Sequence, residues 1–177
     1  TGLTNILIFF LQESLNWTTK ASSGTLVVVG IIAIIVQGGL IGPLVKLFGE
    51  MKLTLIGSGF ILLACTLLIT APKENAIINI YSAVSFLAVG AGLITPTLRA
   101  LISKKLDVDK QGSILSNLQG LQSLGGVLGI AMAGRVYDSF GPKSPFIAGS
   151  IILIFMIYLI AEGKNNNSFN NQKSKVF

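Results

Sequence analysis

The sequence predicts an all-α fold, a polytopic bundle of transmembrane helices. Five long apolar runs, separated by short polar breaks, fill almost all of the 177 residues. Each run reaches about the twenty residues that an α-helix needs to cross the hydrocarbon core of a bilayer. Hydrophobic residues make up 51% of the chain and charged residues 11%, whereas an average soluble domain has about 25% charged residues. We therefore expect an integral, multi-pass membrane protein with the lipid bilayer as a partner.

The expected spans follow one another closely along the chain. They lie at about residues 1–12 (partial), 24–48, 53–71, 76–102, 111–137 and 145–161, and together form one half-bundle at residues 1–163. Because the chain begins with Thr1 rather than Met, and its first apolar stretch is only about half a span long, we expect a fragment that begins inside a helix. Residues 164–177 are rich in Asn, Lys and Ser. They carry too little apolar surface to offset ordering entropy, so a disordered cytoplasmic tail is expected there.

Basic residues are unevenly divided between the two sides of this arrangement. If the partial first span runs outward, nine of the 13 Lys and Arg residues fall in inner loops and four in outer loops. Lys and Arg retained in cytoplasmic loops set the orientation of membrane proteins, so we expect a cytoplasmic C-terminus, in a bacterial plasma (inner) membrane. The net charge of +6 has the same explanation, and no nucleic-acid partner is expected.

The ionisable side chains exclude several kinds of chemistry. The chain has no histidine and a single cysteine, Cys65, so His-based metal sites, catalytic triads and intrachain disulfides are not possible within this segment. A membrane-embedded enzyme needs His, Asp or Glu arranged near one interface for acid–base or metal chemistry. The seven acids are instead scattered over loops and helix ends. We expect no enzyme, no metal site and no cofactor.

One expected span differs from the others in its polarity. Residues 111–137 carry a group of hydroxyl and amide side chains: Ser113, Ser116, Asn117, Gln119, Gln122 and Ser123. Polar groups at bilayer depth are tolerated only against protein or water, so this span is expected to line an interior. Residues 53–71 and 145–161 are almost wholly apolar, which suits outer helices that face lipid. For Asn117, Gln119 and Gln122, hydrogen bonding between helices is as good an explanation as contact with a substrate.

A glycine-rich and charged segment, residues 37–52, joins two of the expected spans. It reads QGGLIGPLVKLFGEMK. Gly42 and Gly49 permit close backbone approach and a tight reversal, while Lys46, Glu50 and Lys52 place alternating charges at the membrane interface. An ordinary charged turn would carry the same features.

This segment resembles the degenerate second copy of the signature loop of the major facilitator superfamily. The inner end of the span at 76–102, TPTLRALIS at residues 95–103, is similar to the family as well. The resemblance covers residues 1 to about 163 and is strongest to the drug–proton antiporter branch. Gly42 and Gly49 match the signature's glycines and Lys52 a basic position. Lys46 and Glu50 stand where the full signature carries an acid and a base respectively.

The resemblance implies the C-terminal six-helix half of a major facilitator fold, from part of helix seven to helix twelve. The missing N-terminal half of the same chain would be a partner, with substrate bound between the halves and exposed alternately to each side. The implied function is secondary active transport, with efflux of small organic or drug-like molecules coupled to protons. Uptake or export of one metabolite, and a non-transporting receptor or assembly subunit, stay open as alternatives.

Two groups of candidate site residues follow. The candidate substrate cavity is formed by Asn5, Phe9, Tyr81, Ser85, Asn117 and Gln122. The candidate cytoplasmic loop and gate is formed by Gly42, Lys46, Gly49, Glu50, Lys52 and Arg99. A cavity wall with aromatic groups, few amides and no fixed charge suits amphipathic or cationic organic molecules. Because no acid lies mid-span, a proton-coupling carboxylate is expected in the missing half, with Glu13 as the rival in this one.

Overall fold

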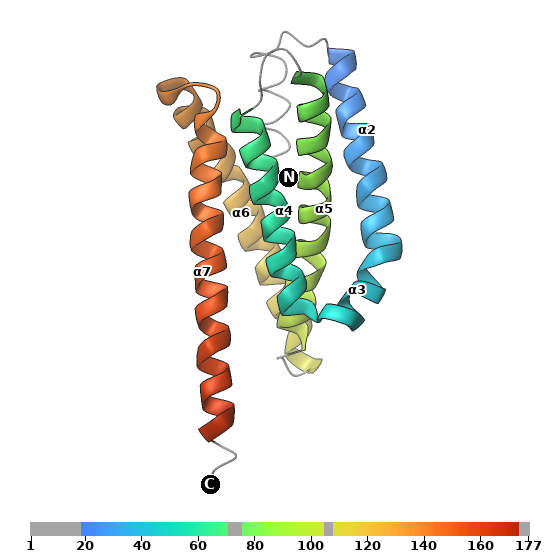
Figure 1. Cartoon of the computed structure of the whole chain (residues 1–177). Coiled ribbons are helices and arrows are strands. Elements are labelled where there is room, and N and C mark those ends of the chain that lie inside the picture. The colour runs from blue at the N-terminus through green and yellow to red at the C-terminus, as the bar shows by residue number, and fades with distance from the viewer. Residues whose placement is uncertain (1–18, 71–75, 105–107, 174–177) are drawn as a thin grey trace.

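The computed structural model describes residues 19–70, 76–104 and 108–173, and every regular element in those ranges is a helix. In order they are α2 (Thr19–Ile35), a π-helical turn η1 (Val36–Leu40), α3 (Ile41–Phe48), α4 (Glu50–Thr70), α5 (Ala76–Ser103), α6 (Val108–Phe140) and α7 (Ser144–Lys173). The long helices run side by side as an up-and-down bundle (Figure 1). The all-α prediction is confirmed.

The apolar runs account for most of these helices. Three helical stretches, Gly24–Phe48, Glu50–Thr70 and Ile77–Ser103, are long and apolar enough to cross a membrane, and Ser144–Ile160 is a shorter apolar helix. A helix is the structure that such runs require in lipid, because it satisfies every internal backbone hydrogen bond within one segment. The 33-residue helix α6 is not among the three, since its amides and hydroxyls lower its mean hydropathy.

The centre of the bundle is the crossing of α4 and α5, where two glycines bring the backbones into contact. A Cβ placed on Gly90 would lie 2.6 Å from the carbonyl oxygen of Gly57, and one placed on Gly57 would lie 3.0 Å from the carbonyl oxygen of Gly90. Small residues allow this close approach of membrane helices, which is stabilised by van der Waals contact. The surrounding core is made of buried apolar side chains from three helices: Ile61, Ala64, Cys65, Leu68, Ile80, Ala83, Val84, Leu87 and Phe146.

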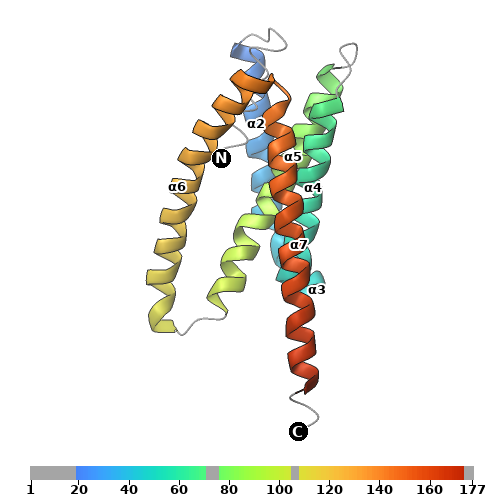
Figure 2. The same ribbon diagram turned by 90° about the vertical axis from the view of Figure 1, so that its left-hand side faces the viewer.

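A buried hydroxyl pair ties the same two helices together nearer the Gly49 turn. Thr54 Oγ1 donates to Thr97 Oγ1 at 3.0 Å, and Thr97 Oγ1 donates to the Leu93 carbonyl at 2.6 Å. Both threonines are fully buried. Pro96 stands inside α5 and cannot donate a backbone hydrogen bond. The lower part of α5 swings away from α4 toward the start of α6 (Figure 2).

Two glycines with positive φ make the sharp reversals. Gly49, at φ 76° and ψ 158°, separates α3 from α4, and its N–H donates to the Val45 carbonyl at 2.8 Å. Gly141, at φ 86°, ends α6 in the same manner, with its N–H on the Tyr137 carbonyl at 2.9 Å. Glycine enters this region without a steric cost from a side chain. These glycines therefore fix where the chain turns back across the bundle.

Helix α6 stands off from the rest of the bundle. It contacts α7 and, more sparsely, α5, and Figure 2 shows it diverging from the α2–α4–α5 layer. Between residues 116 and 135 nearly every side chain is exposed. Both its apolar and its polar faces are therefore open in this chain.

Helix α7 continues to Lys173, well beyond the expected end of the span at Ala161. Residues 164–173 thus extend the helix, where a disordered tail was expected. The physical reason is that propagation of an existing helix needs no new nucleus, and no proline follows Pro145 to stop it. Residues 174–177 lie outside the described residues.

Candidate functional site

A pocket of about 160 Å³ lies between α5 and the α2–η1 segment. Its wall combines small or apolar residues with two polar ones: Val29, Ala33, Gln37, Leu87, Ala88, Ala91, Gly92 and Thr95. Leu87, Ala88 and Gly92 are buried, whereas Gln37 and Thr95 are exposed. The pocket thus has an apolar floor and a polar rim.

The local backbone explains why a pocket forms here. Gln37 belongs to the π-helical turn, which inserts an extra residue into one turn of helix and re-aims the side chains around it; such turns are frequent at functional sites. Opposite, Gly92 has no side chain, and a Cβ there would lie 3.2 Å from Val36 Cγ1 and 3.8 Å from Gln37 Nε2. The missing side chain leaves the room that Gln37 borders.

The two polar rim side chains have no hydrogen-bond partner within the described part of the chain. No bond is made there by the amide of Gln37 or by the hydroxyl of Thr95, although other hydroxyls of α5, such as that of Ser85, donate to carbonyls of their own helix. Gln37 lies near the middle of the apolar stretch Gly24–Phe48. Polar groups at that depth need a partner in protein, water or ligand.

A second polar cluster joins α5 to α6. The guanidinium of Arg99 donates through Nη2 to Gln119 Oε1 and, at 3.4 Å, to Gln122 Oε1. The three side chains are exposed. This cluster links one residue expected in the cytoplasmic gate, Arg99, with one expected in the substrate cavity, Gln122. The guanidinium of Arg99 therefore lies beside one of the residues expected in the cavity, Gln122.

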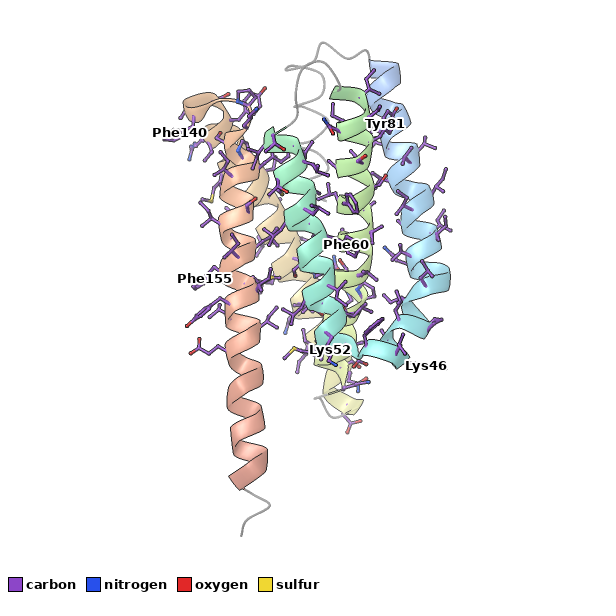
Figure 3. The ribbon with its side chains drawn as sticks, in the orientation of Figure 1. Lys46, Lys52, Phe60, Tyr81, Phe140 and Phe155 are labelled. Atoms are coloured by element: carbon purple, nitrogen blue, oxygen red, sulfur yellow. The ribbon has the colours of Figure 1, made fainter. Side chains whose placement is uncertain are left out.

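An ion pair closes the bundle at the Gly49 turn. Lys104 Nζ, at the end of α5, contacts Glu50 Oε1 at the start of α4. The Lys104 side chain is 67% exposed and that of Glu50 13%. Lys46 and Lys52 lie at the same end (Figure 3) and are exposed.

The remaining candidate residues are spread along the bundle. Tyr81 and Ser85 are half-buried toward the far end of α5, and Ser85 Oγ donates to the Tyr81 carbonyl at 2.8 Å. Tyr81 is 18 residues from Arg99, or roughly 27 Å along a helix at 1.5 Å per residue. Asn117 is exposed on α6. Gly42 is exposed in α3. Asn5 and Phe9 lie outside the described residues, so the described cavity candidates do not converge on one point.

Sequence reasoning missed three residues that the structure places in these clusters. Gln37 and Thr95 border the pocket, and Lys104 is the partner of Glu50. A signal existed for Gln37, which is the one amide within the mostly apolar run at 24–48. In the described residues no group of three or more His, Cys, Asp or Glu side chains could hold a metal ion.

Comparison with known proteins identifies the family of this chain. A sequence model of the Major Facilitator Superfamily matches residues 1–130. The chain belongs to the Major Facilitator Superfamily. With its apolar helices, this member of the superfamily is an integral, multi-pass membrane protein.

Two curated proteins that are similar to this superfamily member are both named as tetracycline resistance proteins. The class C tetracycline resistance protein of Escherichia coli is 27% identical over 130 residues, which cover 73% of this chain and 32% of the relative. The class H protein of Pasteurella multocida is 27% identical over 133 residues, covering 75% of this chain and 32% of the relative. The chain thus spans about a third of the length of these relatives. No solved structure shows a significant match.

Proposed function

We propose that this chain is the C-terminal half of a secondary active transporter that exports small organic molecules by alternating access. The superfamily match and the names of the two relatives support transport and efflux. The relatives are about three times as long as their matching region. An N-terminal half of the same polypeptide would supply the facing wall, with substrate held between the halves.

The pocket between α5 and the α2–η1 segment carries this proposal. Ligand sites are mostly apolar with a few placed polar groups, and this pocket offers an apolar floor with Gln37 and Thr95 at its rim. Its volume of about 160 Å³ is close to that of an engineered cavity of about 150 Å³ that binds benzene. It therefore fits one ring of a larger substrate, whose remaining part would face the other half.

Tetracycline is the first substrate to test, because both relatives are named as tetracycline resistance proteins. The assay is energy-dependent uptake of tetracycline by inverted membrane vesicles that contain the intact transporter. Gln37→Ala removes one hydrogen-bonding group from the pocket. The expected loss in transport efficiency is about fivefold, equivalent to a net hydrogen bond of about 1 kcal/mol.

Thr66→Ala is the matched control. Thr66 is exposed on α4, and its hydroxyl donates only to the Leu63 carbonyl of its own helix, so transport should not change. Equal transport by Gln37→Ala and wild type would remove the pocket from the substrate path. Vesicles that accumulate no organic solute under any gradient would instead favour a receptor or assembly subunit.

We further propose that protons are the coupling ion and that the coupling carboxylate lies in the N-terminal half. The acids in the described ranges, Glu50, Asp109, Asp138 and Glu162, are all near the ends of apolar stretches or of helix α6. A proton-coupling group works best at bilayer depth, where desolvation and a changing neighbour can shift its pKa. Dissipating the pH gradient should abolish uptake, whereas replacing Asp109 by Asn should leave coupling intact.

We also propose an orientation of the bundle in the membrane. Lys46, Lys52, Arg99 and Lys104 lie toward the end of the bundle that contains the Gly49 turn, while Arg135 and Lys143 lie toward the other. The positive-inside rule supports our proposal that the Gly49 end faces the cytoplasm, in a bacterial inner membrane. Labelling of Lys104 by an impermeant reagent from the outside would contradict this placement.

A further inference from the structure

The cluster of Arg99, Gln119 and Gln122 presents mainly hydrogen-bond donors. A guanidinium has five N–H donors and no acceptor, so each amide must turn its oxygen toward it. The two oxygens accept from Nη2 of Arg99, and the NH₂ groups of both glutamines are left pointing elsewhere. The remaining guanidinium and amide N–H groups therefore need acceptors.

No carboxylate neutralises this charge within the described residues. The one ion pair found there joins Glu50 to Lys104, and Arg99 contacts two neutral amides instead. A charge inside a membrane protein is costly and normally faces the interior or a water-filled space with a partner. The described part of the chain thus holds the positive charge but no anionic partner for it.

The direction of the guanidinium argues against a lipid headgroup as the missing partner. Long basic side chains that serve headgroups extend toward the interface, which here is the end that holds Lys104. Arg99 instead reaches Gln119 and Gln122, which stand roughly 16 and 21 Å along α6 from its first residue. Its charge is thus held away from the Lys104 end, between α5 and α6, on an exposed side of both helices.

We infer that Arg99, positioned by Gln119 and Gln122, makes the transporter select substrates that carry a carboxylate or similar anionic group over their cationic counterparts. This inference rests on the proposed function and narrows its substrate class. A carboxylate can accept two parallel N–H bonds from a guanidinium, and the amide NH₂ groups add further donors around it. An organic cation would meet a like charge at the same place.

The experiment compares rhodamine B with its ethyl ester, which share one aromatic body and differ in the free carboxylate. Fluorescence anisotropy measures their binding to the intact transporter in lipid nanodiscs. Wild type should bind the carboxylate about tenfold more tightly than the ester, as expected for a hydrogen bond to a charged group. Arg99→Gln should bring that ratio close to one while leaving the ester's affinity unchanged or higher.

Gln119→Glu tests the same inference without removing the arginine. The new carboxylate neutralises Arg99 from within the cluster, so the preference should again disappear. Arg135→Gln, at the exposed far end of α6, is the control and should keep the tenfold ratio. Equal wild-type affinities, or a ratio that survives both Arg99→Gln and Gln119→Glu, would overturn the inference.

Two further outcomes separate this inference from the proposed function. A preference that is absent with anionic lipid and appears only when anionic lipid is left out of the nanodiscs would assign the cluster to headgroups and overturn the inference. Vesicle transport of both dyes without discrimination would also overturn it, yet would support transport itself. A binding ratio that depends on Arg99, in a protein whose vesicles accumulate no organic solute under any gradient, would support the charge selection and contradict transport.

Discussion

Adding a single methyl group at Gly90 should weaken the bundle at its tightest point. A Cβ there would lie 2.6 Å from the Gly57 carbonyl oxygen and 2.6 Å from Ile61 Cγ1, nearly 1 Å inside the roughly 3.5 Å at which non-bonded heavy atoms attract best. The carbonyl belongs to the backbone of α4 and moves only if the helix moves. Gly90→Ala must therefore push α4 and α5 apart and loosen the core around them.

The magnitude follows from known costs of overpacking. Forcing an extra methyl group into a well-packed core costs typically 1–3 kcal/mol. For a chain of 150–250 residues each kcal/mol shifts the melting temperature by roughly 2–4 °C. Gly90→Ala should therefore melt roughly 6 °C below wild type.

Cys65 supplies the assay. It is the single cysteine of the chain and is 1% exposed in the α4–α5 core, so a fluorogenic thiol reagent reports when this core opens. The melting curve is recorded in detergent, with Cys65 as the only cysteine of the protein used. Gly59→Ala is the control, because Gly59 is on α4 with no atom within 4 Å of an added Cβ. If Gly90→Ala and Gly59→Ala melt at the same temperature, the close crossing is not where this reasoning puts it.

Three more variants can be followed with the same thiol assay. Gly49→Ala forces a side chain into a φ of 76° and ψ of 158°, a region that costs about 1–3 kcal/mol for residues other than glycine. The melting temperature of this variant should therefore fall by several degrees. Gly42→Ala is the control, because an added Cβ there lies in open space and the melting temperature should not change. Thr97→Val removes the buried hydroxyl that joins α5 to α4 and should cost about 0.6 kcal/mol, the average for such bonds in membranes; no change would mean that the bond does not contribute. Lys104→Gln breaks the ion pair with Glu50; because the lysine is exposed and solvent screens the pair, the loss of stability should be small. That loss should disappear in 1 M salt, and a loss that persists there would show a contact other than charge.

Much of the fold could be predicted from local sequence, because lipid leaves few alternatives. Apolar runs of about twenty residues must form helices, and Gly49 and Gly141 mark the turns through a backbone conformation that favours glycine. The exception is α7, whose polar end continues as helix to Lys173. The composition of this segment suggested disorder. Composition alone, however, carries no information about a preceding helix, from which the helical structure can extend at little cost.

The candidate site was less predictable, because its contacts join residues far apart in the chain. Arg99 and Gln122 are 23 residues apart and lie on different helices, so their meeting depends on how α5 and α6 are placed. The π-helical turn at Val36–Leu40 lies within one apolar run that reads as a single continuous helix. Its extra residue leaves no pattern in composition, yet it determines where Gln37 lies.

Water accessibility of α6 tests the central claim most directly. The claim is that this helix, with its exposed amides, faces a watery passage shared with the N-terminal half. Asn117→Cys in the intact transporter, lacking other reactive cysteines, should react with a small membrane-impermeant thiol reagent in vesicles. Ile154→Cys, on the apolar exposed face of α7, should not react. Protection of Asn117→Cys from the reagent on both sides of the membrane, in every state of the transporter, would contradict the account.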